Sequence, residues 1–349
     1  MSASDESPYW RRNLYVCLFG SFINISAMTL LLPFLPIYVA QLGVKGHAAI
    51  VQWSGIAYGI SFLGAGILAP IWGKVADLYG RKLILMRASL GMAICMSLIG
   101  GSLPGLIGLR ATFFLAGGVI FLAFLATSFL IHEDRSHLHE RRRATRSAWS
   151  MIPDKRPVIA MLCTAMLLML ANMSIEPIIT VYVAQLMPPG GDVVFTAGLV
   201  MAASAVGSVL AAPRLGRMAD RIGHWNLIIM CLVGCGVLLI PQAFVANRWQ
   251  LIGLRFLMGV SLAGLLPAIA ATIRHSVPQG AAGTILGYNT SAQYAGQVLG
   301  PLAGGFVGGH IGMRAVFLAT TVIMFGGAAF NWFVSRRIAA APGVNAAAE

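Results

Sequence analysis

Two ionisable side chains, Glu176 and Arg255, lie inside long apolar stretches of the sequence. Hydrocarbon solvates charge poorly, so ionisable groups in membrane-embedded segments are rare and usually functional. Glu176 directly precedes Pro177, and its carboxyl could exchange a proton, attract a cationic compound or accept hydrogen bonds at a helix break. Arg255 could extend to the membrane surface or pair with a carboxylate. A contact between Glu176 and Arg255 is one hypothesis, and separate structural roles are the other.

Apolar helices must position these residues. The 349 residues are 58% hydrophobic and 10% charged, with a mean hydropathy of +0.81, whereas soluble domains are about 25% charged. Apolar stretches of about 20 residues, enough to cross roughly 30 Å of hydrocarbon as helix, recur along the chain. They predict membrane spans at Leu14–Ala40, Ile50–Trp72, Leu83–Ile99, Ala111–Ile131, Val158–Met187, Phe195–Pro213, Trp225–Ala246, Trp249–Ile273, Ala281–Val307 and Ala315–Val334.

The basic residues predict how these spans are oriented. With the N-terminus in the cytoplasm, most of the 24 Lys and Arg residues fall inside, and Lys45, Arg110, Arg248 and Arg314 fall outside. This bias follows the positive-inside rule. It explains the net charge of +13 without nucleic acid as a partner. We expect a multi-pass protein of the inner or plasma membrane, surrounded by membrane lipids, with cytoplasmic N- and C-termini.

Internal repeats divide the chain into two halves. The stretch LPFLPIYVAQLG at 32–43 returns as EPIITVYVAQLM at 176–187. Likewise, APIWGKVADLYGRK at 69–82 returns as APRLGRMADRIGHW at 212–225. Many membrane transporters are built from such repeats, with the substrate site where the repeats face each other.

A third repeat shows that the halves are unequal. GGSLPGLIGLRATFF at 100–114 returns as GGFVGGHIGMRAVFL at 304–318, an offset of 204 residues, whereas the earlier repeats are offset by 144 and 143. The first half therefore lacks about 61 residues near 99–100. In the second half, this interval holds two predicted spans. Losing two spans leaves the direction of the next helix unchanged.

The motif GKVADLYGRK resembles the loop signature of the major facilitator superfamily, in particular its twelve-spanning drug:proton antiporters. Arg81 and Lys82 would face anionic headgroups, and we expect Gly73 and Gly80 to shape the tight turn between two helices. The resemblance implies a gating role for both copies, and a purely topological role is the alternative. The signature residues are Gly73, Asp77, Gly80, Arg81 and Lys82 in the first copy and Gly216, Asp220, Arg221 and Gly223 in the second.

Two further signatures survive in the second half. YAGQVLGPLAGG is similar to the glycine-rich signature of the antiporters, in which small residues four apart let helices approach closely. Arg255 and Gly259 resemble a signature of antiporter helix four. The wider sequence also resembles MdtG-like multidrug efflux proteins, which implies that helices four and five are missing from the first half. The helix-packing residues of the glycine-rich signature are Gly296, Gly300, Pro301, Gly304 and Gly305.

The resemblance implies an all-α membrane protein with the major facilitator fold of two helical bundles. It would have about ten transmembrane helices and an incomplete N-terminal bundle. We expect a four-span N-terminal bundle at 1–131, a cytoplasmic linker at 132–157 and a six-span C-terminal bundle at 158–349.

Catalytic and cofactor motifs are not evident in the sequence. We find no phosphate-binding glycine loop, zinc motif or nucleophile–base set, so we expect no enzyme activity, no cofactor and no metal. His137 and His139 are predicted to lie in a solvated loop. Asn24 and Asn172, in the first helix of each half, are better candidates for substrate contact.

The function that the resemblance implies is secondary active transport, namely proton-coupled efflux of small amphipathic compounds or drugs. Two bundles would rock about a central site to give alternating access. The gap removes helices on which that motion depends. A non-transporting truncated remnant, or a membrane interaction partner, is therefore the alternative, and a sequence lesion in a longer gene product is a third possibility.

Overall fold

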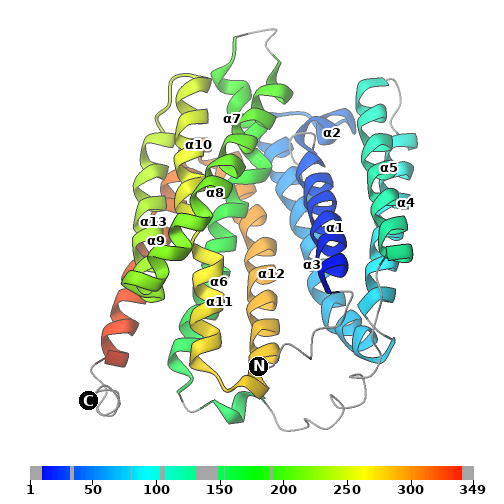
Figure 1. Cartoon of the computed structure of the whole chain (residues 1–349). Coiled ribbons are helices and arrows are strands. Elements are labelled where there is room, and N and C mark those ends of the chain that lie inside the picture. The colour runs from blue at the N-terminus through cyan, green and yellow to red at the C-terminus, as the bar shows by residue number, and fades with distance from the viewer. Residues whose placement is uncertain are drawn as a thin grey trace. The chain divides into compact units, whose positions relative to one another are not determined.

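The regular structure of the described residues is helical in a computed structural model (Figure 1). These residues are 10–31, 35–79, 81–102, 107–130, 148–152, 154–188 and 192–339. The helices of the first half are α1 (Trp10–Leu31), α2 (Leu35–Gln41), α3 (His47–Tyr79), α4 (Arg81–Ser102) and α5 (Ile107–Leu130). Those of the second half are η4 (Ala148–Met151), α6 (Arg156–Ile175), η5 (Glu176–Ile178), α7 (Ile179–Leu186), α8 (Val193–Ile222), α9 (His224–Gln242), α10 (Arg248–Leu262), α11 (Leu265–Ser276), α12 (Gln279–His310) and α13 (Met313–Ala339).

Each predicted membrane span lies on one of these helices or on two or three consecutive ones. In the described part of the chain, six stretches are long and apolar enough to cross a membrane. They are Ala48–Ile67, Arg156–Ile175, Val193–Ile222, His224–Gln242, Arg248–Ser276 and Met313–Ile338. The fold is therefore that of an all-α, multi-pass membrane protein.

The chain divides into two compact units by its contacts. One unit contains Met1–Leu32 and Ile67–Thr145, and the other contains Pro33–Gly66 and Arg146–Glu349. In the first unit, α5 packs against α4 and α1. Gly117 of α5 lies so close to α4 that an added Cβ would be 3.2 Å from the carbonyl oxygen of Ala93.

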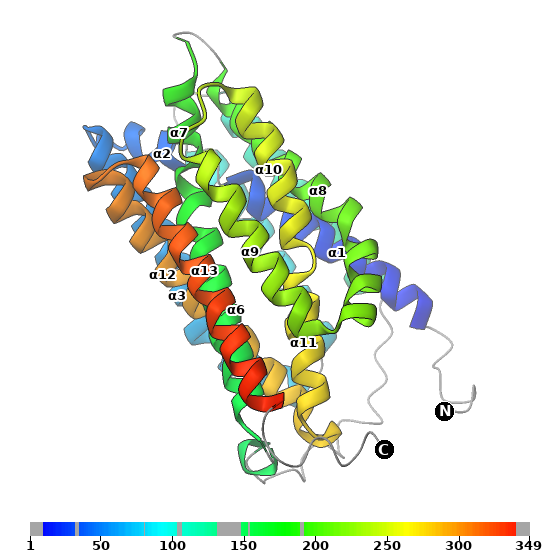
Figure 2. The same ribbon diagram turned by 90° about the vertical axis from the view of Figure 1, so that its left-hand side faces the viewer.

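The second unit is organised around α6, which packs against α12 (Figure 1) and α13 (Figure 2). Two polar contacts join α6 to α13: Asn331 Nδ2 donates to Thr164 Oγ1 over 2.8 Å, and the hydroxyls of Ser174 and Thr320 are 3.0 Å apart. Buried polar groups in a membrane must find partners inside the protein, so these pairs fix how the helices face each other.

The glycine-rich signature gives α12 two close packing faces. Gly296, Gly300 and Gly304, four residues apart, lie against the backbone of α6, where a Cβ on any of them would overlap backbone atoms. On another side, Pro301 and Gly305 lie against α3, and the carbonyl oxygen of Pro301 occupies the space that a side chain on Gly55 would need. The position of α12 between α6 and α3 therefore depends on glycines in α12 itself and on Gly55 in α3.

Candidate functional site

A break in the first helix of the second half positions Glu176. Pro177 has no N–H to donate, so α6 ends at Ile175 and a 3₁₀ turn, η5, leads into α7. The backbone N–H of Glu176 still donates to the carbonyl of Asn172. One turn apart on the same face, Asn172 Nδ2 also donates to Glu176 Oε1 over 2.6 Å. The proline thus fixes the turn, and the asparagine fixes the carboxyl.

Arg255 is held inside the helix packing by the glycine one turn after it. Gly259 of α10 lies against the backbone of Ser204 in α8, so that any Cβ there would overlap it. Ser208 Oγ donates to the carbonyl of Gly259 over 2.8 Å and closes the same crossing. With α8 this close, the Arg255 side chain is only 6% exposed. Arg255 therefore lies among the helices rather than extending to the membrane surface.

Glu176 and Arg255 line one small cavity of about 10 Å³, together with Ile179, Val200 and Met201. A cavity of this size holds about one water molecule. The two charged groups interact electrostatically, while Arg255 Nε and Nη2 have no hydrogen-bond partner among the described residues. The site thus contains a carboxyl group that Asn172 holds in place and a guanidinium group with two nitrogens that lack hydrogen-bond partners among the described residues, in apolar surroundings.

Tyr58 of α3 is a further neighbour of this site. Its side chain is 9% exposed and close enough to Glu176 to interact with it electrostatically. Because charges interact strongly where the dielectric constant is low, protonation of Glu176 would change the balance of forces on both Tyr58 and Arg255. Binding of a proton by Glu176 would therefore alter its interactions with side chains of three helices: Tyr58 of α3, Asn172 of α6 and Arg255 of α10.

The second copy of the gating signature ends α8. Gly223 has a φ of 86°, a value that favours glycine, and it is both the C-cap of α8 and the N-cap of α9. Its N–H donates to the carbonyl of Ala219 over 2.9 Å. Gly216, Asp220 and Arg221 lie within α8, on its exposed surface. The turn that the sequence predicts thus rests on Gly223 alone.

The first copy of the signature corrects one expectation. Gly73 lies inside α3, which runs on to Tyr79, so it does not shape a turn. Asp77 is also helical, and Arg81 and Lys82 begin α4. The helix continues because residues 74–79 contain neither glycine nor proline, and Asp77 lies about one turn after Gly73. Gly80 lies outside the described residues, as do His137 and His139. Asn24 lies on α1, and its side chain is outside the description.

Comparisons with known proteins agree with this architecture. A family model described as Major Facilitator Superfamily matches residues 190–349. The chain is 32% identical to the multidrug resistance protein MdtG of Proteus mirabilis (strain HI4320), with 96% of this chain and 99% of that protein covered. It is 34% identical to MdtG of Salmonella typhi, with 97% and 98% covered.

Two solved structures share the fold. A single-site mutant of the nucleoside transporter NupG aligns with a TM-score of 0.62 at 12% identity, covering 93% of this chain and 99% of that one. The human organic anion transporter MFSD10 (TETRAN) aligns with a TM-score of 0.60 at 14% identity, covering 93% and 100%.

The alignment with the Proteus mirabilis protein also shows a difference in length. It has 397 positions, and 96% of the 349 residues fill about 335 of them. About 60 positions, the difference between 397 and 335, are therefore without a residue from this chain. This number is close to the 61 residues that the repeat offsets predict to be missing.

Proposed function

Because the chain belongs to the major facilitator superfamily, a family of membrane transporters, we propose that its architecture serves proton-coupled export of small amphipathic compounds. The relatives named multidrug resistance proteins support drugs as the substrate class. The further proposal is that the missing hairpin leaves this chain with little export of its own. The orientation with both termini in the cytoplasm, and an inner-membrane location, are part of the same proposal.

The arrangement of Glu176, Asn172 and Arg255 carries the proposal. When Glu176 is ionised, Arg255 is its counter-charge across a cavity of about one water molecule. When Glu176 binds a proton, Arg255 remains buried without that partner, which is costly. The helix arrangement that contains this cavity is then less favourable, so proton binding biases the protein towards another arrangement. In this scheme Glu176 binds the proton, Arg255 senses its binding, and Asn172 orients the carboxyl.

The gating and substrate assignments belong to this proposal as well. Asp77, Arg81, Asp220 and Arg221 would control the cytoplasmic ends of the two halves as the bundles rock. Asn24 would contribute to the substrate cavity from the first half. The four-span bundle at 1–131, the linker at 132–157 and the six-span bundle at 158–349 are the moving parts that this motion requires.

The test uses two versions of the chain in proteoliposomes with an imposed proton gradient. One is the 349-residue chain, and the other carries the missing hairpin of an MdtG relative between Ile99 and Gly100. Ethidium export and proton uptake are measured together. We expect little export by the short chain and proton-coupled export by the filled one. Equal export by both versions would overturn the proposed effect of the gap.

The role of Glu176 is tested in the filled version. We expect Glu176→Gln to reduce export and proton uptake to background, because the amide cannot take up a proton. The matched control is Asp192→Asn, which removes a carboxylate that caps α8 by accepting a hydrogen bond from Phe195 N over 2.9 Å. Coupled export that survives Glu176→Gln would refute the role of Glu176.

The alternative function is that of a membrane interaction partner, which would not transport with or without the hairpin, whereas a truncated remnant would regain export once the hairpin is restored. In that case the filled chain would also fail to export ethidium, although it is folded and inserted. A normal size-exclusion profile combined with absent export in both versions would favour this alternative.

A further inference from the structure

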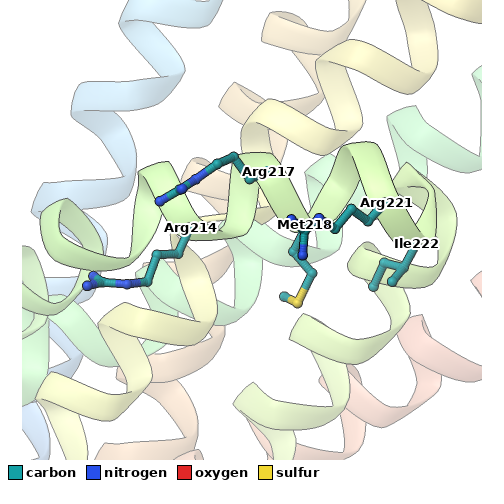
Figure 3. Close-up of a pocket in the computed structure, with 5 residues that line it drawn as sticks. All are labelled: Arg214, Arg217, Met218, Arg221 and Ile222. Carbon is teal, nitrogen blue, oxygen red and sulfur yellow. The ribbon is translucent and has the colours of Figure 1, made fainter.

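A basic depression of about 400 Å³ lies on α8, and of its described lining residues the proposed transport function uses Arg221 alone. Figure 3 shows five side chains that line it, and these described residues all come from one stretch near the C-terminal end of that helix. They are Arg214, Arg217, Met218, Arg221 and Ile222. Three positive charges and two apolar side chains thus share one surface.

The helical spacing explains why these groups lie together. Residues three, four and seven apart lie on one face of a helix, so Arg214, Arg217 and Arg221 form a basic row. Met218 and Ile222, four apart, form an apolar row directly beside it. The depression is therefore amphipathic, with a charged side and an apolar side.

The length of α8 places this surface at the depth of lipid headgroups. The helix has 30 residues, which is about 45 Å at a rise of 1.5 Å per residue. The hydrocarbon core is only about 30 Å thick. The uncharged stretch at 193–212 is long enough to fill that core, and Pro213 and Arg214 begin the part that projects from it. The arginines therefore begin where the hydrocarbon ends.

The side chains of Arg214 and Arg217 are exposed and run back along the helix. Arg214 Nη1 donates to the carbonyl of Leu210 over 3.2 Å, and Arg217 Nε donates to that of Pro213 over 3.4 Å. Figure 3 shows both side chains extending towards the N-terminal end of α8. An arginine has five N–H donors. These contacts use one from each, so several donors remain for an anion approaching from the bilayer.

We propose that this surface binds the headgroup of an anionic phospholipid. The phosphate contacts Arg214 and Arg217, and one acyl chain lies along Met218 and Ile222. The basic row carries three full positive charges, which outweigh the exposed Asp220 carboxylate of the same helix and the roughly half negative charge at a helix C-terminus. The apolar row favours a lipid over a free phosphate anion, because a soluble anion has nothing to place there.

The test measures lipid retention by the purified full-length chain in native mass spectrometry. The probes are phosphatidylglycerol and phosphatidylcholine with identical acyl chains. The variant is Arg214→Gln/Arg217→Gln, and Arg221 is left unchanged because it belongs to the gating signature. We expect phosphatidylglycerol binding to weaken roughly thirty-fold, since each basic residue near an anionic membrane contributes about a factor of five. Phosphatidylcholine binding should barely change.

The matched control removes the same charge elsewhere. Arg336→Gln/Arg337→Gln changes two exposed arginines that end α13, whose guanidiniums already lie over the rings of Trp332 and Phe333 at 4.6 and 4.2 Å. Equal weakening by both double variants would reduce the effect to net charge and overturn the proposal. Displacement of the lipid by an equal concentration of inorganic phosphate would assign the surface to a soluble anion and overturn it as well.

A second measurement needs no variant. A photoactivatable phosphatidylglycerol is cross-linked to the unmodified chain in nanodiscs, and the labelled peptide is identified. We expect labelling within residues 213–222. Labelling confined to other helices would refute the site even if the variants were to unfold.

Discussion

Polar side chains make two kinds of hydrogen bond in the part of the chain that the structure describes. In the second half, several of them link one helix to another, as Asn331 does to Thr164 and as the Tyr182 hydroxyl does to the carbonyl of Gln242 over 2.8 Å. In the first half, the hydroxyls of Ser61 and Thr127 each donate to a carbonyl of their own helix, four residues earlier. The first kind of bond specifies a neighbouring helix, and the second specifies none.

This difference matters in a membrane because burial of apolar surface does not by itself bring helices together. Lipid tails are as apolar as leucine, so close backbone contacts and polar pairs decide which helices meet. The complete half contains both devices, at Gly259 and Gly304 and at Asn331. We therefore expect substitutions at those positions to cost much more stability than matched substitutions at open positions.

The largest effect is expected from Gly259→Leu. The new side chain would overlap the backbone of Ser204 and separate α10 from α8, which should cost about 3 kcal/mol of unfolding free energy. The control, Gly253→Leu, lies on the same helix with open space around it. Thermal midpoints in detergent, followed by size-exclusion chromatography, would show the difference. Equal midpoints would mean that this crossing tolerates expansion.

A smaller effect of defined sign is expected from Gly304→Ala. Its methyl group would overlap the backbone of Ser174, so we expect a loss of about 2 kcal/mol. In Gly287→Ala of the same helix, the methyl group meets open space, and the better helix propensity of alanine should raise stability by up to about 1 kcal/mol. Opposite shifts of the thermal midpoint are the expected outcome, and shifts of the same sign would contradict it.

The pair of Asn331 and Thr164 should contribute about 1 kcal/mol, as interhelical hydrogen bonds in membranes do. A double-mutant cycle with Asn331→Ala and Thr164→Ala isolates this interaction from the loss of packing. Unfolding free energies of the two single variants and the double variant give the coupling. Strict additivity would show that α6 and α13 are held together without this bond.

The smallest effect is expected from Ser61→Ala in the first half. Its hydroxyl is exposed and bonded to the carbonyl of Ala57 in its own helix over 3.0 Å, so the change should stay within about 0.5 kcal/mol. The same thermal assay provides the check. A loss as large as that of Asn331→Ala would erase the contrast between the two halves.

Much of the fold could be predicted from the sequence, because a membrane span is a local property of length and hydropathy. The predicted spans fall on the observed helices. The helix break at Glu176 could be anticipated from Pro177, and the spacing of four residues brings Asn172 to Glu176. The close packing of α12 could likewise be predicted, because its glycines form a stripe of small residues four apart.

The partners of these features could not be predicted, because they depend on which helix faces which. Arg255 is buried because Gly259 draws α8 close, and the sequence left surface extension open as an alternative. Tyr58, Val200 and Met201 border the Glu176 site from helices that no local pattern assigns to it. The interruption between α10 and α11 near Gly264 is absent from the predicted span Trp249–Ile273, although Pro267 in the first turn of α11 marks it. A proline cannot donate to the carbonyl four residues earlier, here that of Ala263, so the helix cannot run unbroken through this point.

The composition of α12 has a consequence for how the protein is made. Asn289, Gln293 and Gln297 place polar side chains in the middle of this continuous helix, which is not among the described stretches that qualify as membrane spans by hydropathy. During synthesis, lipid alone offers no hydrogen-bond partners to the polar side chains of such a segment. Both helices that accept its glycine faces, α3 and α6, leave the ribosome before it does. The order of the helices along the chain thus supplies α12 with its docking sites before it has to enter the bilayer.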